Sequence, residues 1–177
     1  MNHITAVEQL VEILNDANPR EHAQIMKRIK ISAHDLVTNV SWSRQDYTRN
    51  CLARTQEYEI ILLCWDIGSN APIHGHDGKE CWMYQIQGTV QEIRFEAEGE
   101  ALKETNRMTL SPGKLTYMCD RMGYHTIGNV SNERAITLHI YASPIDKCKV
   151  FNDQTESFEL KEMFYDSIED NEVKALV

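Results

Sequence analysis

The feature that most constrains the fold of this chain is a series of short apolar segments, each about as long as one β-strand. These segments are rich in β-branched and aromatic residues, which favour strands, and they span residues 57–65, 81–88, 90–95, 114–119 and 135–141. Turn-forming residues separate them, as in Asp77-Gly78 and Ser111-Pro112-Gly113. Many short strands with regular turns are typical of a β-barrel or a β-sandwich. We therefore predict a mainly β fold after about residue 43.

The first forty residues follow a different pattern, which predicts helices. Apolar residues recur there at the spacing of one helix face, in two stripes formed by Ile4, Val7, Leu10, Val11 and Leu14 and by Ile25, Met26 and Ile29. Asn18 before Pro19 is typical of a capped helix start, and Ser32 with Asp35 indicates a third short helix. The chain thus begins with a short helical segment.

The 177 residues fit one domain, because the sequence contains no repeat, no low-complexity tract and no linker. We divide this domain, residues 1–177, into a helical segment (1–40), a β region (about 44–155) and a tail (156–177). The tail is charged, and we expect it to add a strand or a helix to an edge of the sheet.

Charge and composition argue against several classes of partner. The 27 acidic residues exceed the 18 Lys and Arg residues, and the net charge of −9 repels the phosphate backbone of nucleic acids. The first residues lack the basic start of a secretory signal, and no apolar run approaches the roughly 18–20 residues of a membrane span. The five cysteines form no CxxC pair. We therefore expect free thiols and a cytoplasmic monomer with no nucleic-acid or membrane partner.

Two histidines in the sequence PIHGHDG are the first candidates for a metal site. His74 and His76 are two residues apart, and on a strand such residues point to the same face, so both rings can reach one ion. The pair alone is weak evidence, because two exposed loop histidines would explain it equally well. A third candidate, His125, lies in the sequence GYHTIGN.

The spacing around these histidines resembles the two motifs of the cupin β-barrel family. Gly68 precedes His74 by five intervening residues, and Gly88 stands where the first motif ends. His125, followed after three residues by Asn129, resembles the centre of the second motif.

The position at which ordinary cupins carry a glutamate ligand is different in this chain. Counting from the second histidine, that position is either Glu80 or Cys81, and neighbours on a strand face opposite sides. We favour Cys81 facing inward and Glu80 facing outward, because six residues then separate Cys81 from Gly88, as the motif requires.

Several separated segments resemble the cysteine dioxygenases, a cupin family with three histidine ligands and no carboxylate. They are YTRN at 47–50, ILLCW at 61–65, IHGH at 73–76, GYHTIGNVS at 123–131 and TLHIY at 137–141. The resemblance implies a cupin β-barrel in which His74, His76 and His125 bind one Fe(II) per chain. It also implies a thiol dioxygenase that adds both atoms of O2 to the thiol of free L-cysteine. The substrate would bind iron through its sulfur and its nitrogen, and cysteine sulfinate would be the product. Imidazole suits iron, and three such ligands leave open positions on the ion.

Arg49, in the segment YTRN, matches the residue that binds the substrate carboxylate in this family. A guanidinium offers two parallel donors that fit a carboxylate. Relatives with Gln at this position act on other thiols, so Arg49 implies an α-amino acid. Tyr47 would assist at the carboxylate or simply pack. By residue type alone, Arg49 would be a surface salt bridge, since most arginines are exposed.

Thr137, His139 and Tyr141 alternate with apolar residues, so a strand would place them on one polar face. By alternation alone that face is as readily solvent-exposed as part of a site; the resemblance places it inside the barrel. The resemblance implies that Tyr141 points its hydroxyl at the substrate, that His139 orients Tyr141 by a hydrogen bond, and that Thr137 orients His139.

Cys81 and Tyr141 match the pair joined by a thioether crosslink in animal-type members, so we expect a crosslink in part of the population.

Two other functions stay open. The chain could oxidise a neighbouring thiol such as 3-mercaptopropionate or cysteamine, which would use Arg49 poorly. It could also be a non-catalytic metal-binding cupin or hold zinc with three histidines. This last function would leave Arg49, Cys81 and Tyr141 unexplained as a set.

Overall fold

The computed structural model describes residues 2–44, 46–98 and 101–169. A helical segment comes first and consists of α1 (Val7–Asp16), a 3-10 turn (Pro19–Glu21), α2 (His22–Met26) and a second 3-10 turn (Ala33–Leu36). The strands that follow are β1 (Tyr47–Arg54), β2 (Glu59–Trp65), β3 (Cys81–Gln87), β4 (Val90–Glu98), β5 (Ala101–Leu110), β6 (Leu115–Met118), β7 (Tyr124–Asn129), β8 (Ala135–Tyr141), β9 (Lys147–Asn152), β10 (Ser157–Glu162) and β11 (Ser167–Ile168). A further 3-10 turn (Asp120–Met122) joins β6 to β7.

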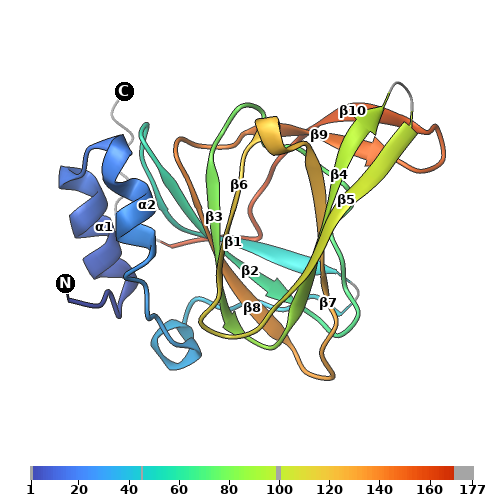
Figure 1. The fold of residues 1–177 in the computed structure, drawn as a ribbon. Helices are drawn as coiled ribbons and strands as arrows, with labels where there is room; N and C mark the ends of the chain where they lie inside the picture. Colours follow the sequence, from blue (N-terminus) through green and yellow to red (C-terminus); the bar gives the residue numbers. More distant parts are fainter. Residues whose placement is uncertain (1, 45, 99–100, 170–177) are drawn as a thin grey trace.

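These strands form sheets that face one another, and the helices cover one outer side (Figure 1). The largest sheet has the order β11-β1-β2-β8-β3-β6, a second has the order β5-β4-β7, and β9 pairs with β10. Among the described strands, the pairing of β11 with β1 is parallel and the other pairings are antiparallel. The mainly β fold with a short N-terminal helical segment that the sequence predicts is therefore confirmed.

Successive residues of the central strands face two different hydrophobic cores. In β8, Leu138 and Ile140 belong to the core that also contains Leu10 of α1, whereas Tyr141 belongs to the core between the sheets. His139, two residues before Tyr141, shares its face. Strands covered on both faces are mostly apolar, which explains the continuous apolar run of residues 60–65 in β2. The helical segment thus covers the apolar face of β8, and the polar face of β8 points into the barrel interior.

The N-terminal segment differs in detail from the sequence prediction. Helix α1 begins at Val7, because Ile4 instead forms a parallel bridge with Ile29. The cap at Asn18 forms as expected, with its side chain accepting a hydrogen bond from a backbone amide of the following turn. His22 is buried, and its ring lies edge-on to that of Trp82 on β3 with the centroids 6.0 Å apart.

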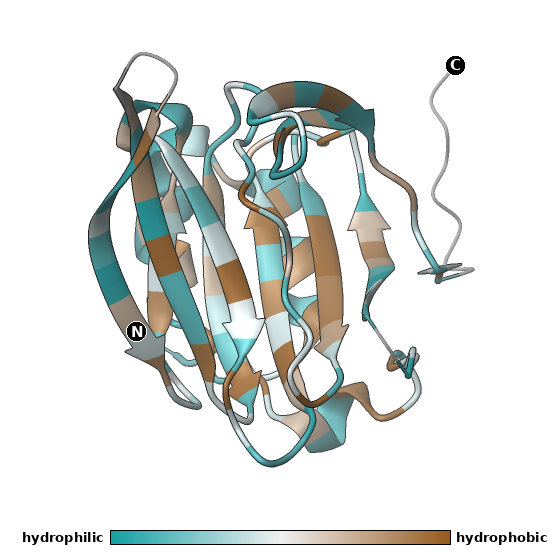
Figure 2. Cartoon of the chain, turned by 90° about the vertical axis from the view of Figure 1, so that its right-hand side faces the viewer, coloured by the Kyte–Doolittle hydropathy of each residue, from teal (hydrophilic) through white to brown (hydrophobic). Residues whose placement is uncertain are grey.

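The charged tail contributes two strands. β10 extends β9 into a hairpin, and β11 adds a parallel edge to β1. Hydrophilic and hydrophobic residues alternate in bands along the outer strands, as expected where one face meets a core and the other meets solvent (Figure 2). All five cysteines are buried free thiols. In the described part of the chain, no helix is long and apolar enough to cross a membrane.

Candidate metal centre and substrate cavity

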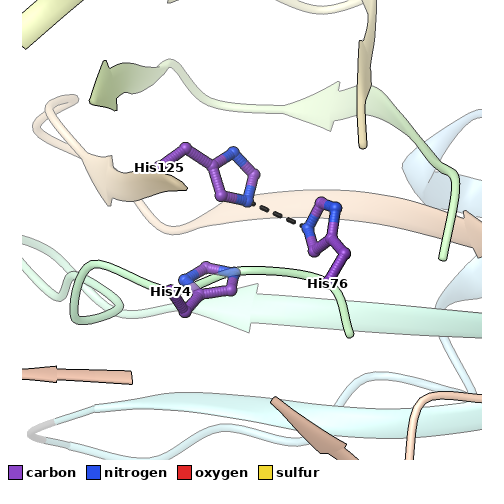
Figure 3. Close-up of side chains that lie close together, drawn as sticks. All are labelled: His74, His76 and His125. Carbon is purple, nitrogen blue, oxygen red and sulfur yellow. Dashed lines mark hydrogen bonds between the residues drawn. The ribbon is translucent and has the colours of Figure 1, made fainter. Parts of the chain in front are cut away.

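The three candidate histidines come together inside the barrel. His125 lies on β7, while His74 and His76 lie in the connection between β2 and β3 rather than on a regular strand. The backbone of His74 pairs with that of His125, each amide donating to the other's carbonyl at 2.9 and 3.0 Å. One ligand atom from each ring lies within 4.8 Å of the others. Figure 3 shows the rings converging on one small space.

The arrangement of these rings fits a metal ion. The Nε2 atoms of His76 and His125 are 3.1 Å apart (Figure 3). Two nitrogens at right angles about an ion, with bonds of about 2.1 Å, would lie about 3 Å apart. Burial lowers the pKa of His74 to about 3 and that of His76 well below its ordinary value, and the neighbouring rings add to both shifts. Both rings are therefore neutral, which is the form that binds metals.

Two of the rings are held with Nε2 free to act as a ligand. Nδ1 of His74 lies 2.9 Å from the carbonyl oxygen of Pro72, and Nδ1 of His125 lies 2.9 Å from a carboxylate oxygen of Glu92. Since both partners only accept, Nδ1 carries the hydrogen in each ring. Such partners fix the orientation of metal-binding histidines.

Glu92 is a functional candidate that the sequence analysis missed. It lies fully buried on β4, beside Arg94, whose Nε donates to it at 3.0 Å. The hydroxyl of Thr116 also donates to it at 3.0 Å. Burial alone would raise the pKa of Glu92, but the hydrogen bonds from His125 and Arg94 and the positive charge of Arg94 outweigh it and hold that pKa at about 2. The signal available in the sequence was an acid and a base two residues apart in VQEIRF, on the inward face of a strand.

A second carboxylate that the sequence analysis missed holds the histidine-bearing connection. Asp120 accepts hydrogen bonds from the backbone amides of His76 and Gly78, at 2.8 and 2.6 Å. These contacts join the connection before β3 to the 3-10 turn before β7. They therefore fix two ligand-bearing segments relative to each other.

A cavity lies beside the histidines, lined by polar residues that include Tyr47, Arg49, His74, His139, Tyr141 and Cys148. Tyr47 stacks on Trp65 with ring centroids 4.7 Å apart. Arg49 is buried, with 8% of its surface exposed, and its Nε donates to the carbonyl oxygen of Phe164 at 3.1 Å. Its Nη2 atom is buried and makes no hydrogen bond in the described structure. No carboxylate of the described residues forms an ion pair with Arg49 within 4.0 Å.

The polar face of β8 lines the same interior. The Thr137 hydroxyl lies 2.9 Å from His139 Nε2 and accepts a hydrogen bond from the indole of Trp65 at 2.9 Å. Cys81 and Tyr141 are direct partners across β3 and β8, so Cys81 faces inward. Sγ of Cys81 is 3.9 Å from His139 Nδ1.

One expected contact on this face differs. Among the described residues no hydrogen bond joins His139 to Tyr141; their rings lie nearly parallel with centroids 6.3 Å apart. Residues two apart on a strand point from the same face, so the two rings lie side by side and do not point at each other. The side chain that approaches Nδ1 of His139 is instead the thiol of Cys81, on the neighbouring strand β3. Burial raises the pKa of Tyr141 far above its ordinary value and lowers that of His139 well below it. The phenol is therefore protonated and the imidazole neutral at neutral pH.

Comparisons with known proteins agree with this arrangement. A sequence profile described as cysteine dioxygenase type I matches residues 2–154. Cysteine dioxygenase type 1 of Rattus norvegicus and that of Homo sapiens are each 27% identical to the chain over 147 residues, covering 80% of this chain and 73% of their own.

Solved structures show the same fold. An uncharacterized conserved protein with a double-stranded β-helix domain from Klebsiella pneumoniae aligns with a TM-score of 0.52 at 16% identity, over 72% of this chain and 95% of its own. The double-stranded β-helix is the cupin barrel that the histidine spacing predicts. The family profile spans most of the chain, including both histidine segments, and the chain therefore belongs to the cysteine dioxygenase type I family.

Proposed function

We propose that this chain is an Fe(II)-dependent dioxygenase that converts free L-cysteine to cysteine sulfinate. Membership of the family and the three-histidine centre support a thiol dioxygenase. The observation that carries the choice of a thiol with a carboxylate, and so of L-cysteine over cysteamine, is the buried, unpartnered Nη2 of Arg49 in the cavity beside His74.

A buried guanidinium without an anion is costly, because it loses hydration and gains no compensating charge. A substrate carboxylate would supply both the charge and the missing hydrogen-bond acceptor. Cysteamine has no carboxylate and would leave Nη2 of Arg49 unpaired, so sites of this kind discriminate strongly against such analogues. An α-amino acid that carries a thiol satisfies the arginine and the histidine centre together.

The histidine centre would hold one Fe(II) through His74, His76 and His125. Three neutral ligands leave the full charge of the ion in place, so an anionic thiolate complements the site. When bound, iron supplies the redox chemistry that joins both atoms of dioxygen to sulfur, while the protein holds the thiol and the carboxylate in position. Glu92 and the Pro72 carbonyl keep two of the rings in the ligating orientation.

Tyr141 and its neighbours would complete the site on the substrate side. Because burial keeps the phenol protonated, Tyr141 can donate a hydrogen bond toward a ligand in the cavity. The hydrogen bond from Trp65 to Thr137, and the contact between Thr137 and His139, fix the His139 ring. We further propose that Cys81 and Tyr141 form a thioether crosslink in part of the population, since the two are direct cross-strand partners.

Reconstitution of the metal-free protein tests the function. The protein is loaded with Fe(II) in air and given L-cysteine, cysteamine or 3-mercaptopropionate, while oxygen uptake and sulfinate are measured. A zinc-loaded sample is the control for metal chemistry. Sulfinate formed preferentially from L-cysteine supports the proposal. Preference for another thiol would indicate a different dioxygenase, and an absence of product with every thiol would favour a binding module.

Replacement of Arg49 tests the observation that carries the substrate choice. Arg49→Ala removes a charge-assisted hydrogen bond, so binding of L-cysteine should weaken by about 2–3 kcal/mol. Arg107→Ala is the control, because Arg107 is exposed on β5 and pairs with Glu104. An unchanged KM for L-cysteine in Arg49→Ala would remove Arg49 from this role.

A further inference from the structure

The segment after β10 runs beside the cavity and pairs with β1. We call residues 163–169 the C-terminal strap; it contains β11 and lies beyond the part of the chain that the family profile matches. Met163, at its start, lines the cavity together with Arg49. The strap is therefore close enough to the proposed carboxylate site to affect it.

Contacts of the strap concentrate on Arg49. The amide of Arg49 donates to a carboxylate oxygen of Asp166 at 2.8 Å, and the amide of Asp166 donates to the carbonyl of Arg49 at 2.8 Å. The side-chain Nε of Arg49 donates to the carbonyl of Phe164 at 3.1 Å. The guanidinium carbon also lies 6.0 Å from the ring centroid of Tyr165. Three consecutive strap residues thus contact one arginine.

The strap is itself fixed to the barrel by polar contacts. The hydroxyl of Tyr165 donates to Glu59, a fully buried carboxylate on β2, and accepts from Arg54 Nη1 at 2.5 Å. Beyond Tyr165, Ser167 donates to the side chain of Asn50 at 2.6 Å. These anchors matter because β11 pairs with β1 over only two residues, too few for a strand to be stable alone.

The contact with Phe164 determines which donors of Arg49 remain available. A guanidinium can meet a carboxylate side-on, through Nε and one Nη, or end-on, through both Nη atoms. The Phe164 carbonyl occupies Nε, so only the terminal amino groups can reach a ligand, and Nη2 is the buried one without a partner.

We propose that the C-terminal strap is the element that makes the site selective for thiols with a carboxylate, by holding Arg49 with its terminal amino groups toward the cavity. This inference rests on the proposed function, because it takes Arg49 as the carboxylate receptor. Asp166 and Tyr165 are positioning residues, since they act on the ligand through Arg49. The exposed side chain of Phe164, at 72% of its surface, has no part in the effect; its backbone carbonyl does.

Binding without turnover tests the strap. L-Cysteine and cysteamine are titrated by calorimetry into the Fe(II)-loaded protein under anaerobic conditions, with thermal unfolding as a check of the fold. Asp166→Ala and Tyr165→Phe should each weaken L-cysteine binding about tenfold, the scale of one or two lost hydrogen bonds. Cysteamine binding should not change. Asp166→Asn, which keeps an acceptor oxygen, should bind L-cysteine as the unaltered protein does, and so should the control Phe164→Ala.

The outcomes separate the strap from the function. If Asp166→Ala and Tyr165→Phe stay folded and bind L-cysteine normally while Arg49→Ala does not, the strap proposal is overturned and the proposed function stands. If the affinities for L-cysteine and for cysteamine decrease by the same factor in the strap variants, the strap stabilises the whole site and does not set its selectivity, and the proposal fails. If Arg49→Ala itself binds L-cysteine normally, Arg49 is not the carboxylate receptor and the strap proposal fails, whereas the proposed function is tested separately by sulfinate formation.

Discussion

The contact between Glu92 and His125 leads to a quantitative prediction about metal affinity. Glu92→Gln keeps an acceptor oxygen near Nδ1 of His125 but removes the negative charge. A hydrogen bond to a charged group contributes about 1.5–3 kcal/mol, against about 0.5–1.5 kcal/mol for a neutral one. The difference, about 1–1.5 kcal/mol, corresponds to roughly tenfold weaker metal binding. This lies at the lower end of the roughly 10–100-fold losses seen when a partner of a metal-binding histidine is removed.

Competition with a chromophoric chelator for Co(II), a stable substitute for Fe(II), measures this affinity without turnover. Glu104→Gln is the matched control, because that carboxylate is exposed on the neighbouring strand β5 and pairs with Arg107. The double variant Glu92→Gln, Arg94→Met removes both members of the buried ion pair and checks that an unpaired Arg94 is not the cause. Equal Co(II) affinities for folded Glu92→Gln and Glu104→Gln would refute the idea that Glu92 sets the donor strength of His125.

Three further predictions concern the same interior. After turnover with iron and L-cysteine, intact mass should show a fraction that has lost two hydrogens, absent in Cys81→Ala; no such fraction in the unaltered protein would remove the crosslink with Tyr141. The metal-free protein should lose stability as pH falls from 7 to 5. The pKa of His74 is about 3 in the folded state against 6.5 unfolded, so the unfolded state takes up a proton that the folded state does not. His74 contributes up to about 1.4 kcal/mol per pH unit once the pH is below 6.5, and a melting temperature independent of pH over that range would contradict this. Asp120→Ala should weaken Co(II) binding more than Asp120→Asn, because only the first removes the acceptor for the amide of His76; equal affinities would show that the connection holds its shape without it.

The sequence was sufficient for the fold class because the five predicted apolar segments all form strands (β2, β3, β4, β6 and β8), although β1, β5, β7 and β9 were not among them. The apolar run of β2 and the polar alternation of β8 both predict strands, whichever way their faces point. Which face of β8 lies inside depended on α1, whose Leu10 belongs to the same hydrophobic core as Leu138. Periodicity reports alternation and not the partner of each face, so alternation alone did not place Thr137 and His139 inside the barrel. The family resemblance predicted that placement, and in the structure both residues are buried.

Local spacing also identified the three histidines, although the structure brings them together in a different way from the one expected. His74 and His76 do not share the face of a regular strand; an isolated backbone bridge from His74 to His125 brings them together. Gly123 contributes to this geometry, with a φ of 86° and a position where a Cβ would clash with the carbonyl of Phe95.

The parts that the sequence did not reveal are contacts between distant segments. Glu92 and His125 are 33 residues apart, and Arg49 and Asp166 are 117 apart. Neither pair has a spacing that a helix or a strand would make regular. A carboxylate such as Glu92 or Asp166 is in addition an ordinary residue in an acidic chain, so its role becomes visible only from its partner.

Turnover with isotopically labelled dioxygen tests the central claim most directly. The Fe(II)-loaded protein is given L-cysteine under the labelled gas, and the product is analysed by mass spectrometry. The proposed function predicts cysteine sulfinate in which both oxygen atoms on sulfur carry the label, with one molecule of dioxygen consumed for each product. A product with label in only one of these positions, or oxidation of L-cysteine to cystine without sulfinate, would contradict it.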